Sequence, residues 1–240
     1  MMIHYSYIHF SDGLRHRCFH IIPFWRTQIS NTIRGYAAEF GITVAQGLNQ
    51  VEPLLVRLAQ AESVPESARD LFALQGRDYA QLQVELKSIE ARLKAWHRAN
   101  ADSRRLAKIP GVGPIGAATA VMKTPDPHAY PSGRHFAAWI GLTPKDHSTA
   151  GKTRHGKITR AGDERLRSVL VAGATAVIQQ AKKGRGRPSP WLIALLKRKP
   201  PKLAAVALAN KNARIVWKLM VTGESYDGAR MPEASGAAAA

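Results

Sequence analysis

The chain has 240 residues, and its apolar fraction of 45% is enough for a buried core and excludes wholesale disorder. Its 35 Lys and Arg outnumber 17 Asp and Glu, and the formal charge of +18 indicates a polyanionic partner, most often nucleic acid. One cysteine excludes an internal disulfide framework, and no apolar run reaches the roughly 20 residues of a membrane span. We therefore expect a cytoplasmic protein without a membrane segment.

The first part of the chain gives weak signals. Residues 1–23 show neither a helical nor an alternating period, and we expect no regular structure there. A helix is predicted over residues 24–40, with Gly41 as its C-terminal stop. A short helix is expected within residues 50–61, and Pro53 fits only its first turn. The histidines near Cys18 offer too few ligands for a tetrahedral site, so no metal site is predicted.

The clearest helical period lies between residues 70 and 97. There, mostly apolar residues recur in alternating steps of three and four positions and form a seam along one side of the predicted helix. The seam consists of Phe72, Gln75, Tyr79, Leu82, Leu86, Ile89, Leu93 and Trp96. This heptad predicts a long helix that forms a coiled coil or a helical hairpin. The alternative is an amphipathic helix that lies on its own domain, because a seam does not identify its partner. A coiled coil would make the chain a homo-oligomer through this helix.

A glycine-rich turn joins two predicted helices within residues 104–123, as in a helix-hairpin-helix. Gly111 and Gly113 lie on either side of a valine in the sequence Pro-Gly-Val-Gly-Pro. Two glycines at this spacing let the backbone approach a phosphate, and the next helix offers free N–H groups. The alternative is that these residues only make a tight turn, and that the alanines after them allow close helix packing.

A polar segment between residues 142 and 166 carries the candidate chemistry. Its cations are Lys145, Lys152, Arg154, Lys157, Arg160 and Arg165. Within it Ser148 and Thr149 form a hydroxyl pair. Several cations near one hydroxyl would stabilise a developing oxyanion and neutralise a scissile phosphate, so either hydroxyl could attack while Lys152 or Arg154 stabilises charge. Hydrogen bonding of these hydroxyls to nearby backbone is the alternative.

The rest of the chain is predicted to be helical. Helices are expected over residues 132–140, 163–183 and 203–221, and another after Ser189. The connection at residues 182–188 contains Arg-Gly-Arg-Pro, the core of a minor-groove AT-hook, although a solvated basic linker is the favoured interpretation. A polar patch that could reach nucleic acid is formed by Asn210, Lys211 and Arg214. A disordered tail is expected over residues 224–240.

Four longer stretches resemble a known family. GLTPKDHSTAGKTRHGKITRAGDERLRSVLVAGA, with IPGVGPIGAATAV upstream and VALANKNARIVWKLM near the end, is similar to the C-terminal half of the insertion-sequence transposases of the IS one-ten and IS eleven-eleven group. RTQISNTIRGYAAEFGITVAQG resembles the helix that closes their N-terminal domain. The resemblance implies a remnant of a RuvC-like domain at residues 24–48, a coiled-coil linker at 49–103 and a transposase domain at 104–223. The fold class is then mainly α.

For function, the resemblance implies DNA transposition with a catalytic serine after the GLTP element. It further implies a RuvC-like domain whose four carboxylates bind Mg²⁺, and guidance by a structured bridge RNA. Where family members carry Ser-Ser-Gly or Ser-Thr-Gly-Gly, this chain has Ser148-Thr149-Ala150-Gly151, so the nucleophile falls on Ser148 or Thr149. The only acidic residue before Trp25 is Asp12.

We therefore expect an N-terminally truncated family member that does not itself hold Mg²⁺. The alternatives are a non-catalytic DNA- or RNA-binding remnant, and a coiled-coil scaffold, which would leave the basic segment unexplained.

Overall fold

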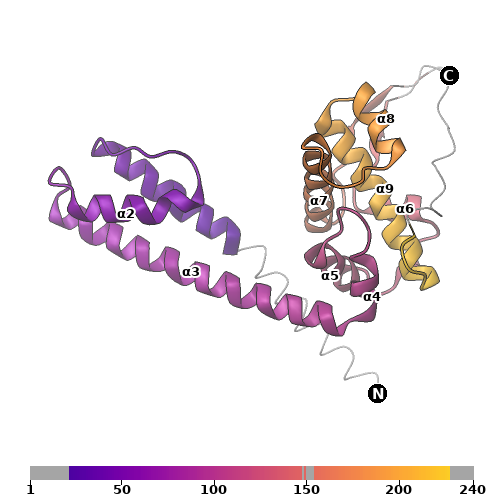
Figure 1. Cartoon of the computed structure of the whole chain (residues 1–240), viewed down its shortest axis with the longest axis horizontal. Coiled ribbons are helices and arrows are strands. Elements are labelled where there is room, and N and C mark those ends of the chain that lie inside the picture. The colour runs from indigo at the N-terminus through magenta and orange to yellow at the C-terminus, as the bar shows by residue number, and fades with distance from the viewer. Residues whose placement is uncertain (1–21, 148, 150–153, 228–240) are drawn as a thin grey trace. The chain divides into compact units, whose positions relative to one another are not determined.

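A computed structural model describes residues 22–147, 149 and 154–227. The described chain is mainly α, as predicted, and contains one two-stranded sheet (Figure 1). None of the described helices is long and apolar enough to cross a membrane. The chain divides between Leu93 and Lys94 into two compact units. Expectations for residues 1–21 and 228–240 lie outside the described part.

The described residues of the first unit form three helices and a short 3-10 turn. A helix spans residues 22–39, and Gly41 adopts a φ of +73°, as expected for a helix stop. It is followed by η1 (Leu48–Gln50), α2 (Val51–Gln60) and α3 (Glu66–Ala99), which continues past the unit boundary. A shared core joins the three helices and contains Ile33, Ala37, Ile42, Val51, Leu54, Leu58, Val64, Phe72 and Tyr79.

The predicted heptad is visible in α3, whose buried side chains recur every seventh residue: Phe72, Tyr79, Leu86 and Leu93. The first two of these belong to the core of the first unit. The Tyr79 hydroxyl donates a hydrogen bond of 3.0 Å to the Leu48 carbonyl, and a Cβ atom on Gly76 would meet the Leu55 side chain at 3.1 Å. The N-terminal half of the seam thus packs within its own chain. Oligomerisation through this helix stays a prediction.

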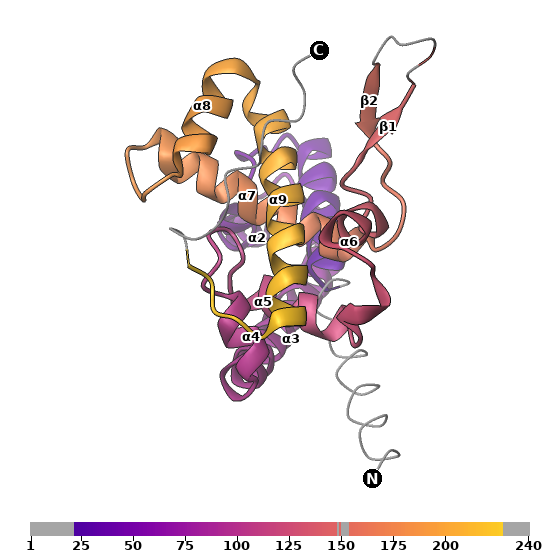
Figure 2. The same ribbon diagram turned by 90° about the vertical axis from the view of Figure 1, so that its right-hand side faces the viewer.

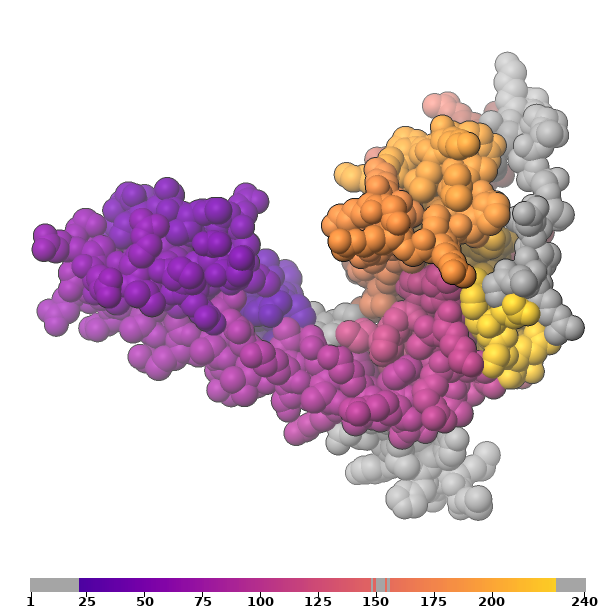
Figure 3. All heavy atoms as spheres, viewed as in Figure 1, coloured from indigo at the N-terminus to yellow at the C-terminus, as the bar shows by residue number. Residues whose placement is uncertain are grey.

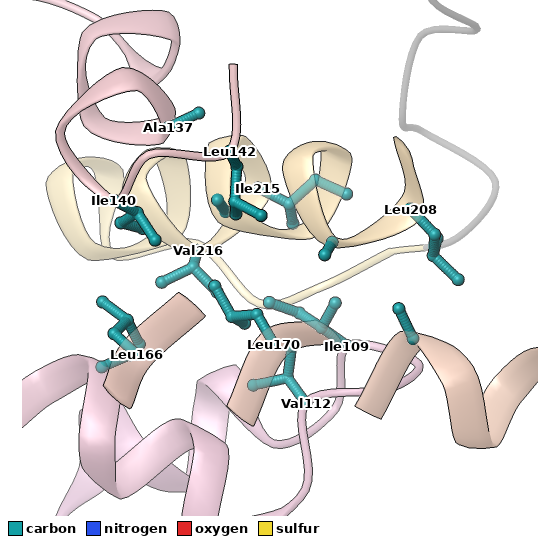
Figure 4. Close-up of a cluster of buried hydrophobic side chains, with 14 of the residues drawn as sticks. Ile109, Val112, Ala137, Ile140, Leu142, Leu166, Leu170, Leu208, Ile215 and Val216 are labelled. Atoms are coloured by element: carbon teal, nitrogen blue, oxygen red, sulfur yellow. The ribbon is translucent and has the colours of Figure 1, made fainter. Parts of the chain in front are cut away.

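The second unit is built around α9 (Pro201–Thr222), which contacts α4 (Ala101–Leu106), α6 (Gly133–Trp139), α7 (Glu164–Lys182) and α8 (Pro190–Arg198) (Figure 2). Helix α5 (Pro114–Lys123) packs on α4 and α7, and η2 (Pro127–Ala129) contacts α9. Figure 4 shows the core between these elements, where Ile109 and Val112 meet Leu170 and Val216.

Several helix ends follow the sequence signals. Ser132, Asp163 and Ser189 each accept a backbone hydrogen bond as N-cap residues of α6, α7 and α8. Gly223 ends α9 in a left-handed conformation with a φ of +72°, and the Arg105 guanidinium donates a hydrogen bond of 2.7 Å to its carbonyl. These caps set the length of the helices around the unit's core.

The polar segment, for which no strand was predicted, contains β1 (Pro144–Asp146) and β2 (His155–Ile158). The two strands form an antiparallel hairpin in which Pro144 pairs with Ile158 and Asp146 with His155, with an irregularity between these pairs. The strands are short, and their sequences lack the alternation of apolar and polar residues on which strand prediction depends.

Candidate nucleic-acid interface

The hairpin of β1 and β2 carries the hydroxyl-bearing part of the predicted site. The strands extend from the α6 end of the second unit (Figure 2). The His147 N–H donates a hydrogen bond of 2.9 Å to the Arg154 carbonyl, which continues the pairing beyond β1. Thr149 lies between the strands in the sequence and is exposed. Ser148 and Lys152 lie outside the described residues.

Three of the predicted cations surround one surface hollow. This hollow has a volume of about 320 Å³ and is lined by Lys145, His147, Lys157, Ile158, Thr159 and Arg160. Lys145, Lys157 and Arg160 are exposed. A small hollow edged by cations suits an anionic group such as a phosphate. His147 was not among the predicted site residues, and a Cβ atom on Gly156 would stand 2.9 Å from its ring, so Gly156 leaves room for this imidazole.

The base of the hairpin is fixed by two glycines at which backbone segments cross. Gly141 and Gly162 have φ values of +78° and +71°. A Cβ atom on Gly162 would collide with the Trp139 carbonyl oxygen, and one on Gly141 would collide with the Ala161 backbone. Only glycine fits both the backbone conformation and the space. The chain segments that enter and leave the hairpin are therefore in direct backbone contact.

A buried arginine of α7 holds these two segments together. The Arg167 side chain donates hydrogen bonds of 2.8 Å to the Ile140 carbonyl and 2.9 Å to the Ala161 carbonyl. Arg167 is 9% exposed. Sequence reasoning missed this residue, although a cation between Leu166 and Leu170 on the apolar side of a helix is a usable signal, because a buried charge requires partners.

The start of α7 is fixed by a carboxylate. Asp163 accepts a hydrogen bond of 2.8 Å from the Leu166 N–H and forms an ion pair of 3.0 Å with Lys123 of α5. Burial by itself raises the pKa of Asp163, but the Leu166 N–H and the Lys123 ammonium outweigh it, so its pKa lies below the ordinary value. The helix that positions Arg167 is thereby tied to α5.

The glycine connection between α4 and α5 has one glycine facing inward and one facing outward. Gly111 has a φ of +85°, and a Cβ atom there would meet the Gly173 carbonyl at 3.1 Å. The Asn212 side chain donates a hydrogen bond of 2.9 Å to the Pro110 carbonyl. Gly113 is exposed, has open space around it and precedes Pro114, the first residue of α5. Gly113 is thus exposed and Gly111 half-buried, and phosphate contact at both glycines stays a prediction.

The remaining predicted contacts lie away from the hollow. The Lys211 ammonium of α9 stands 4.5 Å from the centroid of the Trp191 ring of α8. Arg214 contacts Gly133 at the start of α6 through its backbone and Cβ atom, and Arg165 is partly buried in the first turn of α7. The Asn210 side chain donates a hydrogen bond of 3.2 Å to the Leu142 carbonyl. The structure brings together Lys145, Lys157 and Arg160, but not these α9 and α7 residues.

The described residues do not fit the Mg²⁺ ion that the family resemblance implies. Among residues 22–147, 149 and 154–227 no group of three or more His, Cys, Asp or Glu side chains could hold a metal ion. No reaction step is therefore assigned to a metal held by this part of the chain.

Comparison with known proteins defines the class of this helical unit and its hairpin. Residues 103–187 match the family described as Transposase IS116/IS110/IS902 family. This range runs from α4 through α7 and includes the glycine connection, the hairpin and its base. The chain thus carries a transposase domain of the IS116/IS110/IS902 family.

Similar proteins support this assignment. The chain is 62% identical over 202 residues to the transposase y4pF/y4sB of Sinorhizobium fredii, which covers 84% of the chain and 52% of that relative. It is 39% identical over 209 residues to a family 20 transposase of Pseudomonas aeruginosa, covering 84% of the chain and 60% of the relative. The transposase for insertion sequence element IS1111A of Coxiella burnetii is 36% identical over 207 residues, with 84% and 56% covered. The chain spans little more than half the length of these relatives.

Proposed function

We propose that the chain acts in DNA transposition as the DNA-binding, hydroxyl-bearing part of an insertion-sequence transposase. The observation that carries this proposal is the hollow on the hairpin, where Lys145, Lys157 and Arg160 converge. The exposed Thr149 belongs to the same hairpin. The names of the relatives, all transposases, support the reaction class.

The proposed chemistry is a phosphoryl transfer to the protein. The hydroxyl oxygen of Ser148 or Thr149 attacks a DNA phosphorus atom, and a phosphodiester bond between protein and DNA forms. The bond from phosphorus to one DNA oxygen breaks, and that oxygen leaves as an alcohol after taking up a proton. Attack by a DNA hydroxyl on the new ester reverses the step and completes strand exchange. No high-energy cofactor is consumed, because each phosphodiester bond is exchanged for another.

The cations of the hairpin have two roles in this scheme. Lys145, Lys157 and Arg160 hold a phosphate at the hollow through charge-assisted hydrogen bonds. Lys152 or Arg154, which follow the hydroxyl pair in the sequence, stabilises the charge that develops on the phosphoryl oxygens. At the glycine connection, Gly113 and the start of α5 contact the DNA backbone without reading bases.

The complete reaction is proposed to need further parts. A carboxylate domain holding Mg²⁺, as the family resemblance implies, would activate the attacking or leaving oxygen. A structured RNA would select the site, and a second copy of the chain would be joined through α3. The carboxylate domain and the RNA are proposed from family membership, and the second copy from the heptad of α3.

The test is strand exchange in a reaction complemented with a full-length relative that lacks its own hydroxyl pair. The double variant S148A/T149A should abolish exchange while leaving DNA affinity within about twofold, because neither hydroxyl carries charge. The single variants then show which hydroxyl acts. Exchange at the unaltered rate by the double variant would refute the proposed nucleophile.

A second candidate is a non-catalytic protein that grips nucleic acid. The exposed cations around the hollow explain binding without any reaction. This candidate predicts steeply salt-dependent binding and no exchange in the complemented reaction, with identical behaviour of the wild-type chain and S148A/T149A. Salt-independent binding would contradict both candidates.

A further inference from the structure

A second cationic surface lies at the two ends of α8, away from the hairpin. From residue 165 to residue 223 the sequence contains no Asp or Glu. Eight cations flank α8 and are all exposed: Lys182, Lys183, Arg185, Arg187, Lys197, Arg198, Lys199 and Lys202. Within the described residues, none of these eight forms an ion pair. This surface of the second unit is shown in orange in Figure 3.

The connection between α7 and α8 is fixed at both ends and open in the middle. The Arg185 N–H donates a hydrogen bond of 2.9 Å to the Gln180 carbonyl, and the Ser189 hydroxyl caps α8. Gly184, just before the first anchor, and Gly186, between the two, have φ values of +68° and +81°, with no atom within 4 Å of an added Cβ. Arg185 therefore projects from the backbone with a glycine on each side, and Arg187 lies between Gly186 and Pro188.

This shape suits a narrow groove. A·T-rich duplex DNA has a narrow minor groove with an enhanced negative potential that attracts inserted arginines. Glycines beside the arginines let the backbone approach the groove floor. The minor groove of an RNA duplex is wide and shallow, so it would not enclose the same connection between two closely spaced phosphate backbones. The charge and the shape together favour duplex DNA.

The second group of cations stands at a matching distance. Helix α8 has nine residues and is about 14 Å long, so Lys197 and Lys199 lie roughly one helix length from its first residue, which exceeds the width of a minor groove. At that distance their ammonium groups reach the phosphates that border the groove.

We propose that Arg185 and Arg187 enter the minor groove of A·T-rich duplex DNA, and that the cations after α8 bind the adjacent phosphates. This inference rests on the proposed function, in which the chain acts on DNA. In Figure 2, α8 and the hairpin of β1 and β2 lie at the same end of the second unit, with α9 between them. DNA held at α8 is thereby placed beside the hairpin.

The test measures binding of the full chain to four labelled 20-base-pair duplexes by fluorescence anisotropy. The duplexes are A·T-rich DNA, G·C-rich DNA, the same G·C-rich DNA with inosine for guanine, and A·U-rich RNA. Inosine removes the amino group from the minor groove and leaves the major-groove edge of guanine unchanged. The proposal predicts that the A·T and inosine duplexes bind about tenfold more tightly than the G·C duplex.

Two variants assign this preference to the connection. R185K/R187K keeps both charges, and should lower the preference for A·T DNA to about twofold or less with little change in G·C affinity. The control R77A/K87A removes two exposed cations from α3 and should keep the full preference. Circular dichroism checks that each variant is folded.

The outcomes separate the two proposals. Binding to all duplex DNA without a preference for A·T and inosine duplexes would overturn this inference and leave the proposed function intact. An A·T preference that survives in R185K/R187K, or tighter binding to the RNA duplex, would also overturn it. Failure to bind any DNA would refute the proposed function itself.

Discussion

Gly173 of α7 lies against the carbonyl group of Gly111, so close that a Cβ atom on Gly173 would collide with that oxygen. Helix α7 can reach the glycine connection only because both positions lack a side chain. The same helix carries Arg167, which holds the base of the hairpin. The connection between α4 and α5 and the hairpin are thus fixed to one helix.

Replacement of Gly173 by alanine should destabilise the second unit strongly. The added methyl group meets backbone atoms, which cannot rotate away, so we expect a loss of about 3 kcal/mol in the free energy of unfolding. Chemical denaturation measures it. The matched control is G113A, which adds the same methyl group in open space, on the connection that Gly173 contacts. An equal loss of stability in the two variants would contradict the packing described here.

The G113A variant also tests phosphate contact at the connection. The added methyl group leaves the fold intact but keeps a phosphate from the backbone, so we expect DNA affinity to fall several-fold. Gly35 provides the control, because it likewise has open space around it but lies in the first unit. If G113A and G35A bind DNA equally well, Gly113 does not contact it.

Replacement of Arg167 by methionine should loosen the base of the hairpin. The carbonyls of Ile140 and Ala161 lose their donor, and we expect a cost of about 3 kcal/mol. Hydrogen exchange measured by mass spectrometry should show faster exchange at the His147 and Thr159 N–H groups, which pair across the hairpin. Lysine at the same position keeps the charge and N–H donors but lacks the rigid, planar guanidinium, and should give an intermediate rate. Unchanged exchange in R167M would show that the arginine does not hold the hairpin.

Arg160 has a strained backbone and also lines the hollow. Replacing it by glycine relieves the strain and removes the cation, so stability and DNA affinity should change in opposite directions. Its φ of +58° is unusual for a residue with a side chain. The variant R160G should gain up to about 1 kcal/mol of stability because the strain is relieved. It should bind DNA more weakly, and its salt dependence of binding should fall by about one unit of slope. Higher stability with unchanged DNA affinity in R160G would show that Arg160 does not contact DNA.

The low pKa of Asp163 makes the stability of the second unit depend on pH. Because the folded-state pKa lies below the unfolded value, the carboxylate stabilises the fold fully above about pH 4. This contribution is lost as the pH falls through the lower, folded-state value. The D163N variant lacks this stabilisation. The difference between the midpoint temperatures of thermal unfolding of wild type and D163N should therefore shrink as the solution is acidified. A gap independent of pH would contradict the ion pair with Lys123.

The helices could be predicted because their signals are local. Ser132, Ser189 and Gly223 mark helix ends through contacts with residues three or four positions away. The strands of the hairpin were not predicted, since their residues are polar and their pairing depends on the glycines at the base. The contact of Gly111 with Gly173 joins residues 62 positions apart, and no local pattern reports it.

For the candidate site, composition indicated the right segment but not its arrangement. The cations Lys145, Lys157 and Arg160 were predicted from their number alone, and the structure places them round one hollow. Lys211 was predicted as a nucleic-acid contact from its place on a polar patch, and it contacts the Trp191 ring across two helices. Such a pairing follows from tertiary packing, which the polarity of a helix surface does not specify.

The central claim is that a hydroxyl on this hairpin forms an ester with DNA. The most direct measurement traps the complemented reaction by denaturation, digests protein and DNA, and locates the residue that carries the remaining nucleotide by mass spectrometry. The account predicts a nucleotide on the oxygen of Ser148 or Thr149, absent from S148A/T149A. A nucleotide on any other residue, or strand exchange without a covalent intermediate, would contradict it.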